Sequence, residues 1–177
     1  MNSKFLLLNI LILFFIVGCS QKQIQFNGVN DMKLTSINFV QNGTIPSEFT
    51  CDSVNVNPEL DISDVPKNAK SLALIMDDPD AVVGTFVHWV AWNIPAETKK
   101  IQKNTEPSGV HGKSGSGKLG YFGPCPPSGT HRYFFKLYAL DTTLNIPEGS
   151  GKADLEKAMH DHIIEKTELM GLYKRNK

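Results

Sequence analysis

Residues 70–95 read KSLALIMDDPDAVVGTFVHWVAWNIP, and this stretch decides the expected fold. Residues 70–76 are apolar on both faces, which indicates a strand in the centre of a sheet. Residues 85–94 form a long run of aromatic and β-branched side chains that ends at Pro95, which is typical of a second strand. A third strand is predicted at residues 130–140, where apolar side chains alternate. The chain is therefore expected to be mainly β.

The rest of the chain adds weaker strand signals and one helix. Short strands are predicted at residues 34–40 and 49–51, and around Leu60 and Ile62, which alternate with polar neighbours. Residues 154–170 carry apolar side chains at three- and four-residue spacing, which predicts a helix that Gly171 would end. Strands that precede one terminal helix argue against a parallel βαβ fold.

The N-terminus has the pattern of an export signal. A basic start is followed by an apolar run at residues 5–17, which is shorter than the roughly 20 residues of a membrane-spanning helix. Its length suits a secretory signal instead. The sequence Ile16-Val17-Gly18-Cys19 resembles the lipobox of bacterial lipoproteins. This resemblance implies a signal peptide at 1–18, a tether at 19–31 lipidated on Cys19, and one domain at 32–177, anchored to a bacterial membrane outside the cytoplasm. A plain signal peptide or an uncleaved anchor is the alternative.

Composition limits the kinds of partner. The 177 residues fit one domain, and 18 basic against 18 acidic residues give no long-range attraction to nucleic acid. The only arginines are Arg132 and Arg175, so an anion site would need histidine, lysine or backbone N–H groups. Cys51 and Cys125 could form a disulfide in an exported protein. Two buried or pocket-rim thiols are the equally open alternative.

The glycine-rich loop at residues 106–118 contains a misleading motif. Its last seven residues, GKSGSGK, match the start of a phosphate-binding P-loop. Leu119 follows where serine or threonine should bind magnesium, no apolar strand precedes the motif, and Gly120 stands where a helix should begin. We therefore expect no nucleotide site.

Two clusters of residues could carry chemistry. The first is Asp77-Asp78-Pro79-Asp80 with His88, and the second is Gly123-Pro124-Cys125-Pro126-Pro127 with His131. If the three long strands are neighbours, both histidines and the acidic turn would meet at one rim. Imidazole and backbone N–H groups would donate to a small anion, while aspartates would orient the imidazoles. The alternative is that the aspartates cap a turn and the histidines are core residues.

These motifs resemble two signatures of the phosphatidylethanolamine-binding family, also called Raf-kinase-inhibitor-like proteins, in its bacterial form. The first runs from Asp78-Pro79-Asp80 to Asn93-Ile94-Pro95, and the second from Gly123 to Leu140. The resemblance implies a Greek-key β-sandwich with a terminal helix, short helical turns and a small anion-binding cavity. Carried over by motif, the lining residues would be Asp78, Asp80, His88, Gly123, Pro126, Pro127, His131 and Tyr133. One departure is Val82, because proline usually follows the alanine of this motif.

The function expected from the sequence is binding without catalysis. The resemblance implies a phosphate-like anion or phosphorylated head group as ligand and a protein partner as a further role. No cofactor or metal is expected. Arg132 lies on the opposite strand face from His131 and is expected to be a structural ion-pair partner. One alternative is an inhibitor or interaction module for an envelope protease or kinase. A metal-dependent hydrolase is the weaker alternative, since no H-E-x-x-H pair is present.

Overall fold

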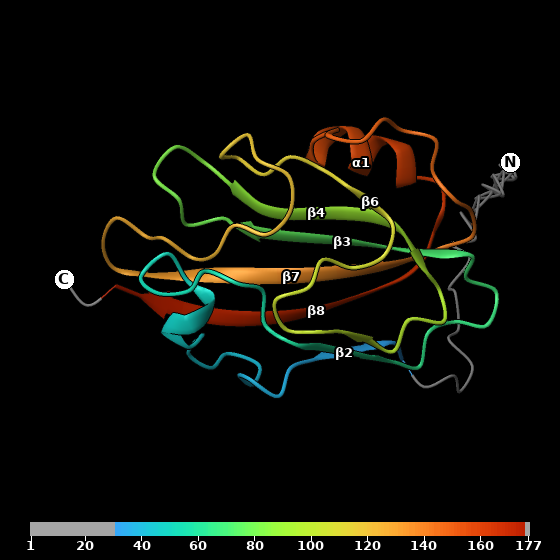
Figure 1. Cartoon of the computed structure of the whole chain (residues 1–177). Coiled ribbons are helices and arrows are strands. Elements are labelled where there is room, and N and C mark those ends of the chain that lie inside the picture. Colours follow the sequence, from blue (N-terminus) through green and yellow to red (C-terminus); the bar gives the residue numbers. More distant parts are fainter. Residues whose placement is uncertain (1–30, 176–177) are drawn as a thin grey trace, which may run out of the picture.

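The computed structural model describes residues 31–175, which form two β-sheets and one helix (Figure 1). This sandwich-like arrangement confirms the prediction of a mainly β fold with one C-terminal helix. The signal peptide, Cys19 and most of the tether predicted from the sequence lie outside the described residues. Within residues 31–175, no helix is long and apolar enough to cross a membrane.

The large sheet has five antiparallel strands in the order β6-β4-β3-β7-β8. Its central strand is β3, and all eight of its residues are buried, as the two-faced apolar run at 70–76 predicted. The bounds are β3 Ser71–Asp78, β4 Phe86–Pro95, β6 Val110–His111, β7 Thr130–Leu140 and β8 Ile163–Lys174. The strands β4 and β7 therefore flank β3 on its two sides.

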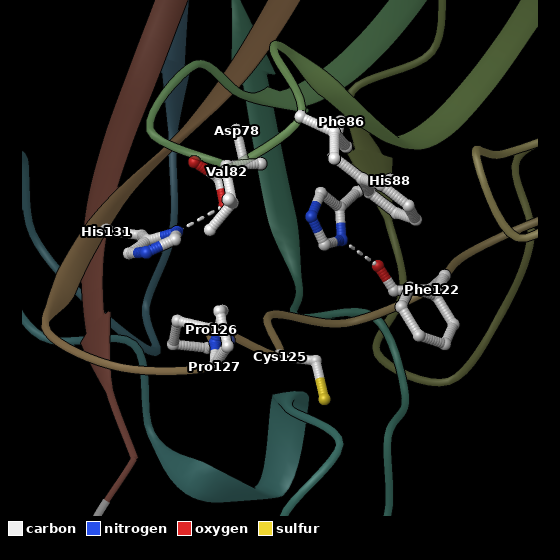
Figure 2. Close-up of a pocket in the computed structure, with 11 residues that line it drawn as sticks. Asp78, Val82, Phe86, His88, Phe122, Cys125, Pro126, Pro127 and His131 are labelled. Atoms are coloured by element: carbon white, nitrogen blue, oxygen red, sulfur yellow. Dashed lines mark hydrogen bonds and ion pairs between the residues drawn. The ribbon is translucent and has the colours of Figure 1, made fainter.

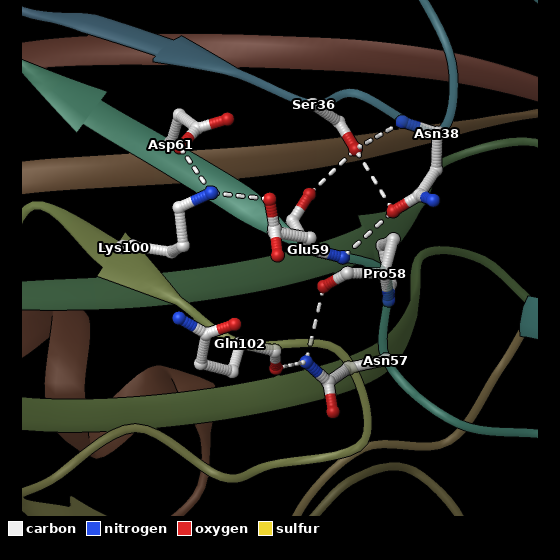
Figure 3. A network of polar contacts seen from close by, with 8 residues as sticks. All are labelled: Ser36, Asn38, Asn57, Pro58, Glu59, Asp61, Lys100 and Gln102. Atoms are coloured by element: carbon white, nitrogen blue, oxygen red, sulfur yellow. Dashed lines mark hydrogen bonds and ion pairs between the residues drawn. The ribbon is translucent and has the colours of Figure 1, made fainter.

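The small sheet has three strands in the order β1-β2-β5, with β1 Lys33–Thr35, β2 Leu60–Ser63 and β5 Lys100–Ile101. The strand predicted at 34–40 is shorter because two polar side chains bond to the backbone beside β2 (Figure 3). Ser36 Oγ donates to the Glu59 carbonyl over 2.5 Å, and Asn38 Oδ1 accepts from the Glu59 N–H over 2.9 Å. Lys100 forms ion pairs with Glu59 and Asp61 across the same sheet.

Both faces of the large sheet are covered by apolar side chains. Between the sheets, Leu74, Trp89 and Phe135 belong to the larger buried cluster. On the other face, the helix α1 (Lys152–Met159) covers a second cluster that includes Ile75 and Trp92 (Figure 1). Because β3 is enclosed from both sides, its sequence is apolar without alternation.

Two local predictions were wrong. The helix predicted at 154–170 ends at Met159. A turn at residues 160–162 follows, and from Ile163 the chain forms β8, which pairs with β7 along almost its whole length. Gly171 does not end a helix: it lies within β8, where a Cβ atom would come within 2.5 Å of the Ile45 side chain. The strand predicted at 49–51 is wrong as well, because residues Ser47–Phe49 form the short 3-10 helix η1.

Candidate functional site

A cavity of about 350 Å³ opens at the end of the large sheet where β3 leads into β4 and where β7 begins (Figure 2). Five of the eight residues proposed from the sequence line it: Asp78, His88, Pro126, Pro127 and His131. Sequence reasoning missed five other lining residues, namely Ala81, Val82, Val83, Phe86 and Phe122. Cys125, which belongs to the second cluster and was considered as a pocket-rim thiol, also lines the cavity. Phe86 could have been found, since it lies two residues before His88 on the predicted strand.

His131 is oriented by Asp78 from the neighbouring strand. His131 Nδ1 donates to Asp78 Oδ2 over 2.7 Å, and both side chains are buried. A carboxylate only accepts hydrogen bonds, so Nδ1 carries the proton. Nε2 of the neutral ring is then an acceptor, and it becomes a donor when the ring gains a second proton. The two residues lie 53 positions apart in the sequence, and the pairing of β3 with β7 brings them together.

His88 enters the cavity from a β-bulge in β4. Met76 pairs with Trp89 and Asp77 with Val87, so His88 is the extra residue of the irregularity. Its Nδ1 donates to the Phe122 carbonyl over 2.6 Å, which again leaves Nε2 as an acceptor in the neutral ring. Burial lowers the pKa of His88 below its usual 6.5, although the Phe122 carbonyl and the Asp78 carboxylate oppose this shift.

Tyr133 lies behind the cavity, against both imidazoles. Its ring centroid is 5.2 Å from that of His88 and 6.5 Å from that of His131. The hydroxyl is buried and has no hydrogen bond of good geometry within residues 31–175, while the Asp78 carboxylate and the Cys125 backbone lie close to it. Burial and the negative charge of Asp78 raise the pKa of Tyr133, so its hydroxyl remains a donor.

Pro126 and Pro127, the proline wall of the cavity, directly follow a cysteine that forms a disulfide. Cys125 is bonded to Cys51, with 5.4 Å between their Cα atoms, so the disulfide alternative is the one that the structure contains. The Cys51 N–H also donates to the Pro124 carbonyl over 3.1 Å. Gly123 does not line the cavity; its N–H donates to Asn55 Oδ1, and a Cβ there would lie 2.4 Å from the Phe49 carbonyl oxygen. It is the close packing of this segment that requires glycine.

Asp80 also lies outside the cavity lining. Its carboxylate accepts two hydrogen bonds from the Arg132 guanidinium, at 2.6 and 2.9 Å, and one from the Arg132 backbone N–H at 3.0 Å. The hydrogen bond from Arg132 lowers the pKa of Asp80 to about 2. Arg132 is thus the structural ion-pair partner that its strand face predicted. Asp78 Oδ1 accepts from the Asp80 N–H over 2.8 Å, so Asp78 caps this turn as well as orienting His131.

The electrostatic character of the site follows from these contacts. Each imidazole has Nδ1 engaged in a hydrogen bond, and the phenol of Tyr133 lies close to both rings. The remaining walls are aromatic, aliphatic or proline side chains. Within residues 31–175, no three histidine, cysteine, aspartate or glutamate side chains are arranged to hold a metal ion. The arrangement can therefore bind a small polar group at the imidazoles and an apolar group beside it.

Comparison with known proteins places the chain in a family. The model of the phosphatidylethanolamine-binding protein family matches residues 35–174. A UPF0098 protein of Methanothermobacter thermautotrophicus is 48% identical over 150 residues, covering 81% of this chain and 99% of that protein. A UPF0098 protein of Chlamydia trachomatis is 40% identical over 150 residues, with 82% and 100% covered.

Two solved structures have the same fold. A putative phosphatidylethanolamine-binding protein homologue, CT736 of Chlamydia trachomatis, superposes with a TM-score of 0.81 at 40% identity, covering 83% of this chain and 99% of that one. YbcL of E. coli, described as a new member of the mammalian family, has a TM-score of 0.77 at 27% identity, with 83% and 100% covered.

Proposed function

The chain belongs to the phosphatidylethanolamine-binding protein family, and we propose that it binds a phosphate or a phosphorylated head group between His88 and His131 without transforming it. The observation that carries the proposal is that two imidazoles from different strands line one cavity, each oriented through Nδ1. A protonated ring donates from Nε2, and such charge-assisted bonds are roughly twice as strong as neutral ones. The largely apolar walls would strengthen them further.

Anion binding at this site would be coupled to proton uptake. Neutral His88 and His131 both present an accepting Nε2, because their Nδ1 atoms donate to Phe122 and Asp78. An acceptor repels the lone pairs of a fully ionised phosphate, whereas a protonated ring attracts them. Binding should therefore strengthen as pH falls, and for His88 the change lies below pH 6.5 because its pKa is lowered.

The lining residues also favour binding over catalysis. Among the cavity-lining side chains of the described chain there is no serine, threonine or lysine, and the one cysteine is in a disulfide. A covalent mechanism would need a nucleophile next to a general base. Each imidazole donates through Nδ1 to a fixed partner, which sets the orientation of the ring.

The test is calorimetric titration of the full-length chain with inorganic phosphate and with phosphoethanolamine, between pH 5 and 8. His131→Ala and His88→Ala should each weaken binding by about 1.5–3 kcal/mol, the contribution of a hydrogen bond to a charged group. The matched control is His162→Ala, because His162 is exposed, pairs with Asp141 and does not line the cavity. Affinity that does not change with pH, or equal losses in all three variants, would contradict the proposal.

We further propose that the domain is tethered to the outer surface of a bacterial membrane through Cys19. The supporting observations are the lipobox-like sequence and the position of residue 32. The Met32 N–H donates to Glu165 near the start of β8, whereas His131 pairs with Tyr173 near its end. These two points are about 26 Å apart along the strand, at 3.3 Å per residue. Met32 and the cavity therefore lie near opposite ends of β8. Incorporation of labelled palmitate that is lost in Cys19→Ser would support this tether, and equal labelling of both proteins would refute it.

A further inference from the structure

We propose that Val82 and Val83 select ligands that carry a hydrocarbon group next to their anionic group. This inference rests on the anion site proposed above and adds the chemical class of the ligand. Its basis is the loop between β3 and β4, where two consecutive valines border the same cavity as His88 and His131. Figure 2 shows Val82 beside these residues. An anion site by itself has no need of such side chains.

The two valines are unusually exposed for apolar residues. Val82 is 82% and Val83 92% exposed, the highest values among the exposed large hydrophobic residues of the described chain. Residues 81–86 carry no charged side chain. Scattered exposed apolar residues need no explanation, but these two are adjacent and continuous with a cavity. Contact with a bound hydrocarbon would remove their surface from water.

The cavity has room for such a group. Its volume of about 350 Å³ lies within the range of small-molecule sites, roughly 300–1,000 Å³. The ionisable lining groups are Asp78, His88 and His131, and all other lining side chains are apolar or belong to the disulfide. Phe86 and Phe122 form the wall beside His88, with ring centroids 4.9 and 5.8 Å from the imidazole. The surface next to the anion would therefore be hydrocarbon.

The loop is held in position before any ligand arrives. At its start, Asp80 is bonded to Arg132 and its N–H donates to Asp78. At its end, the Gly84 N–H donates to the Ala81 carbonyl over 3.0 Å, and Gly84 has a φ of 97°, which favours glycine. The turn is closed at both ends, so the valines are presented at a defined place. A preorganised contact loses less entropy on binding.

The experiment is titration of the full-length chain with inorganic phosphate and with methyl, butyl and hexyl phosphate. Full burial of a methylene corresponds to about a fourfold gain in affinity, so half burial should give about twofold for each carbon up to butyl. In the double variant Val82→Ser, Val83→Ser, the ratio of butyl phosphate to methyl phosphate affinity should fall to near one. Val40→Ser is the matched control, because Val40 is 73% exposed and does not line the cavity; it should keep the full ratio.

The outcomes separate this inference from the function on which it rests. If inorganic phosphate does not bind, the anion site itself is refuted. If phosphate binds but affinity is independent of alkyl length, or the gain persists in the double variant, the role of the valines is refuted. Co-sedimentation with phosphatidic acid vesicles identifies the source of the ligand. Sedimentation that falls in the double variant indicates a lipid. Equal sedimentation of both proteins, with an alkyl gain in the parent chain that the double variant loses, indicates a free phosphate ester.

Discussion

Asp77 and Asp78 are adjacent carboxylates at the end of β3, yet they serve opposite faces of the sheet. Asp77 pairs with Lys136 at 2.7 Å and Lys152 at 2.6 Å, which links α1 to the sheet. Asp78 pairs with His131 beside the cavity. Both carboxylates are almost completely buried. A buried charge must be paired, and the two faces meet this requirement in different ways.

The difference between the two faces lies in the partner. Lysine stays protonated throughout the physiological range, so the Asp77 cluster has one charge state and acts as a structural link. The partner of Asp78 is instead an imidazole that lines the cavity, so this pair can contact a ligand. One face of the strand is therefore suited to stability and the other to recognition. The four predictions below test this division.

The largest effect is expected from the disulfide on the cavity side. Replacing both Cys51 and Cys125 by alanine opens a loop of 74 residues, which should lower the free energy of unfolding by about 4 kcal/mol. Phosphate affinity should fall as well, because Cys125 adjoins the proline wall. Urea unfolding and titration of the variant measure the two effects. Unchanged affinity in a folded double variant would show that the wall keeps its shape without the disulfide.

A smaller loss of stability is expected on the helix side. Asp77→Asn removes the shared partner of Lys136 and Lys152, which are each about one-fifth exposed. Breaking a buried pair costs about 3–5 kcal/mol, and the partial exposure of the lysines should reduce this to about 2 kcal/mol. Phosphate affinity should not change. A loss of affinity comparable with that in the cavity variants would show that the two faces are not independent.

Asp78→Asn should reduce phosphate affinity as well as stability, whereas Asp77→Asn should reduce stability alone. The amide oxygen can accept from only one of the two donors that the carboxylate serves, His131 Nδ1–H and the Asp80 N–H, so stability should fall by about 1–2 kcal/mol. Phosphate affinity should fall about tenfold, because the His131 ring loses the carboxylate that orients it, and a tenfold change is about 1.4 kcal/mol. Chemical denaturation and calorimetry distinguish the two effects. The division between the faces would fail if stability fell more than in Asp77→Asn.

The smallest effect concerns pH and the ligand-free protein. Burial lowers the pKa of His88 in the folded state, so the unfolded chain binds more protons once pH falls below about 6.5. The contribution of His88 to the free energy of unfolding should therefore be fully present above pH 6.5 and decrease below it. Between pH 7 and 5.5 the melting temperature should fall by about 2 °C more than in His88→Gln. Saturating phosphate should reduce this difference. If the melting temperature depends on pH in the same way in both proteins, His88 is not the group responsible.

Much of this architecture could be predicted from local patterns. The run at 130–140 coincides with β7, and the apolar run at 70–76 corresponds to β3. The failures occurred where local pattern and tertiary pairing competed. Residues 163–174 contain polar positions that suit a helix or a strand, and pairing with β7 decided in favour of a strand. Asp80 was proposed for the cavity, but the fork geometry of Arg132 draws it to the opposite side of the turn.

The sequence by itself determined the three central strands β3, β4 and β7 and which residue types could meet at their ends, because side-chain alternation and burial are local properties of a strand. Only the tertiary structure decided that His88 and His131 share a cavity. This depends on β3 lying between β4 and β7, and on a bulge that adds His88 to one strand of a pair. Both are consequences of long-range backbone pairing, which no short stretch of sequence encodes.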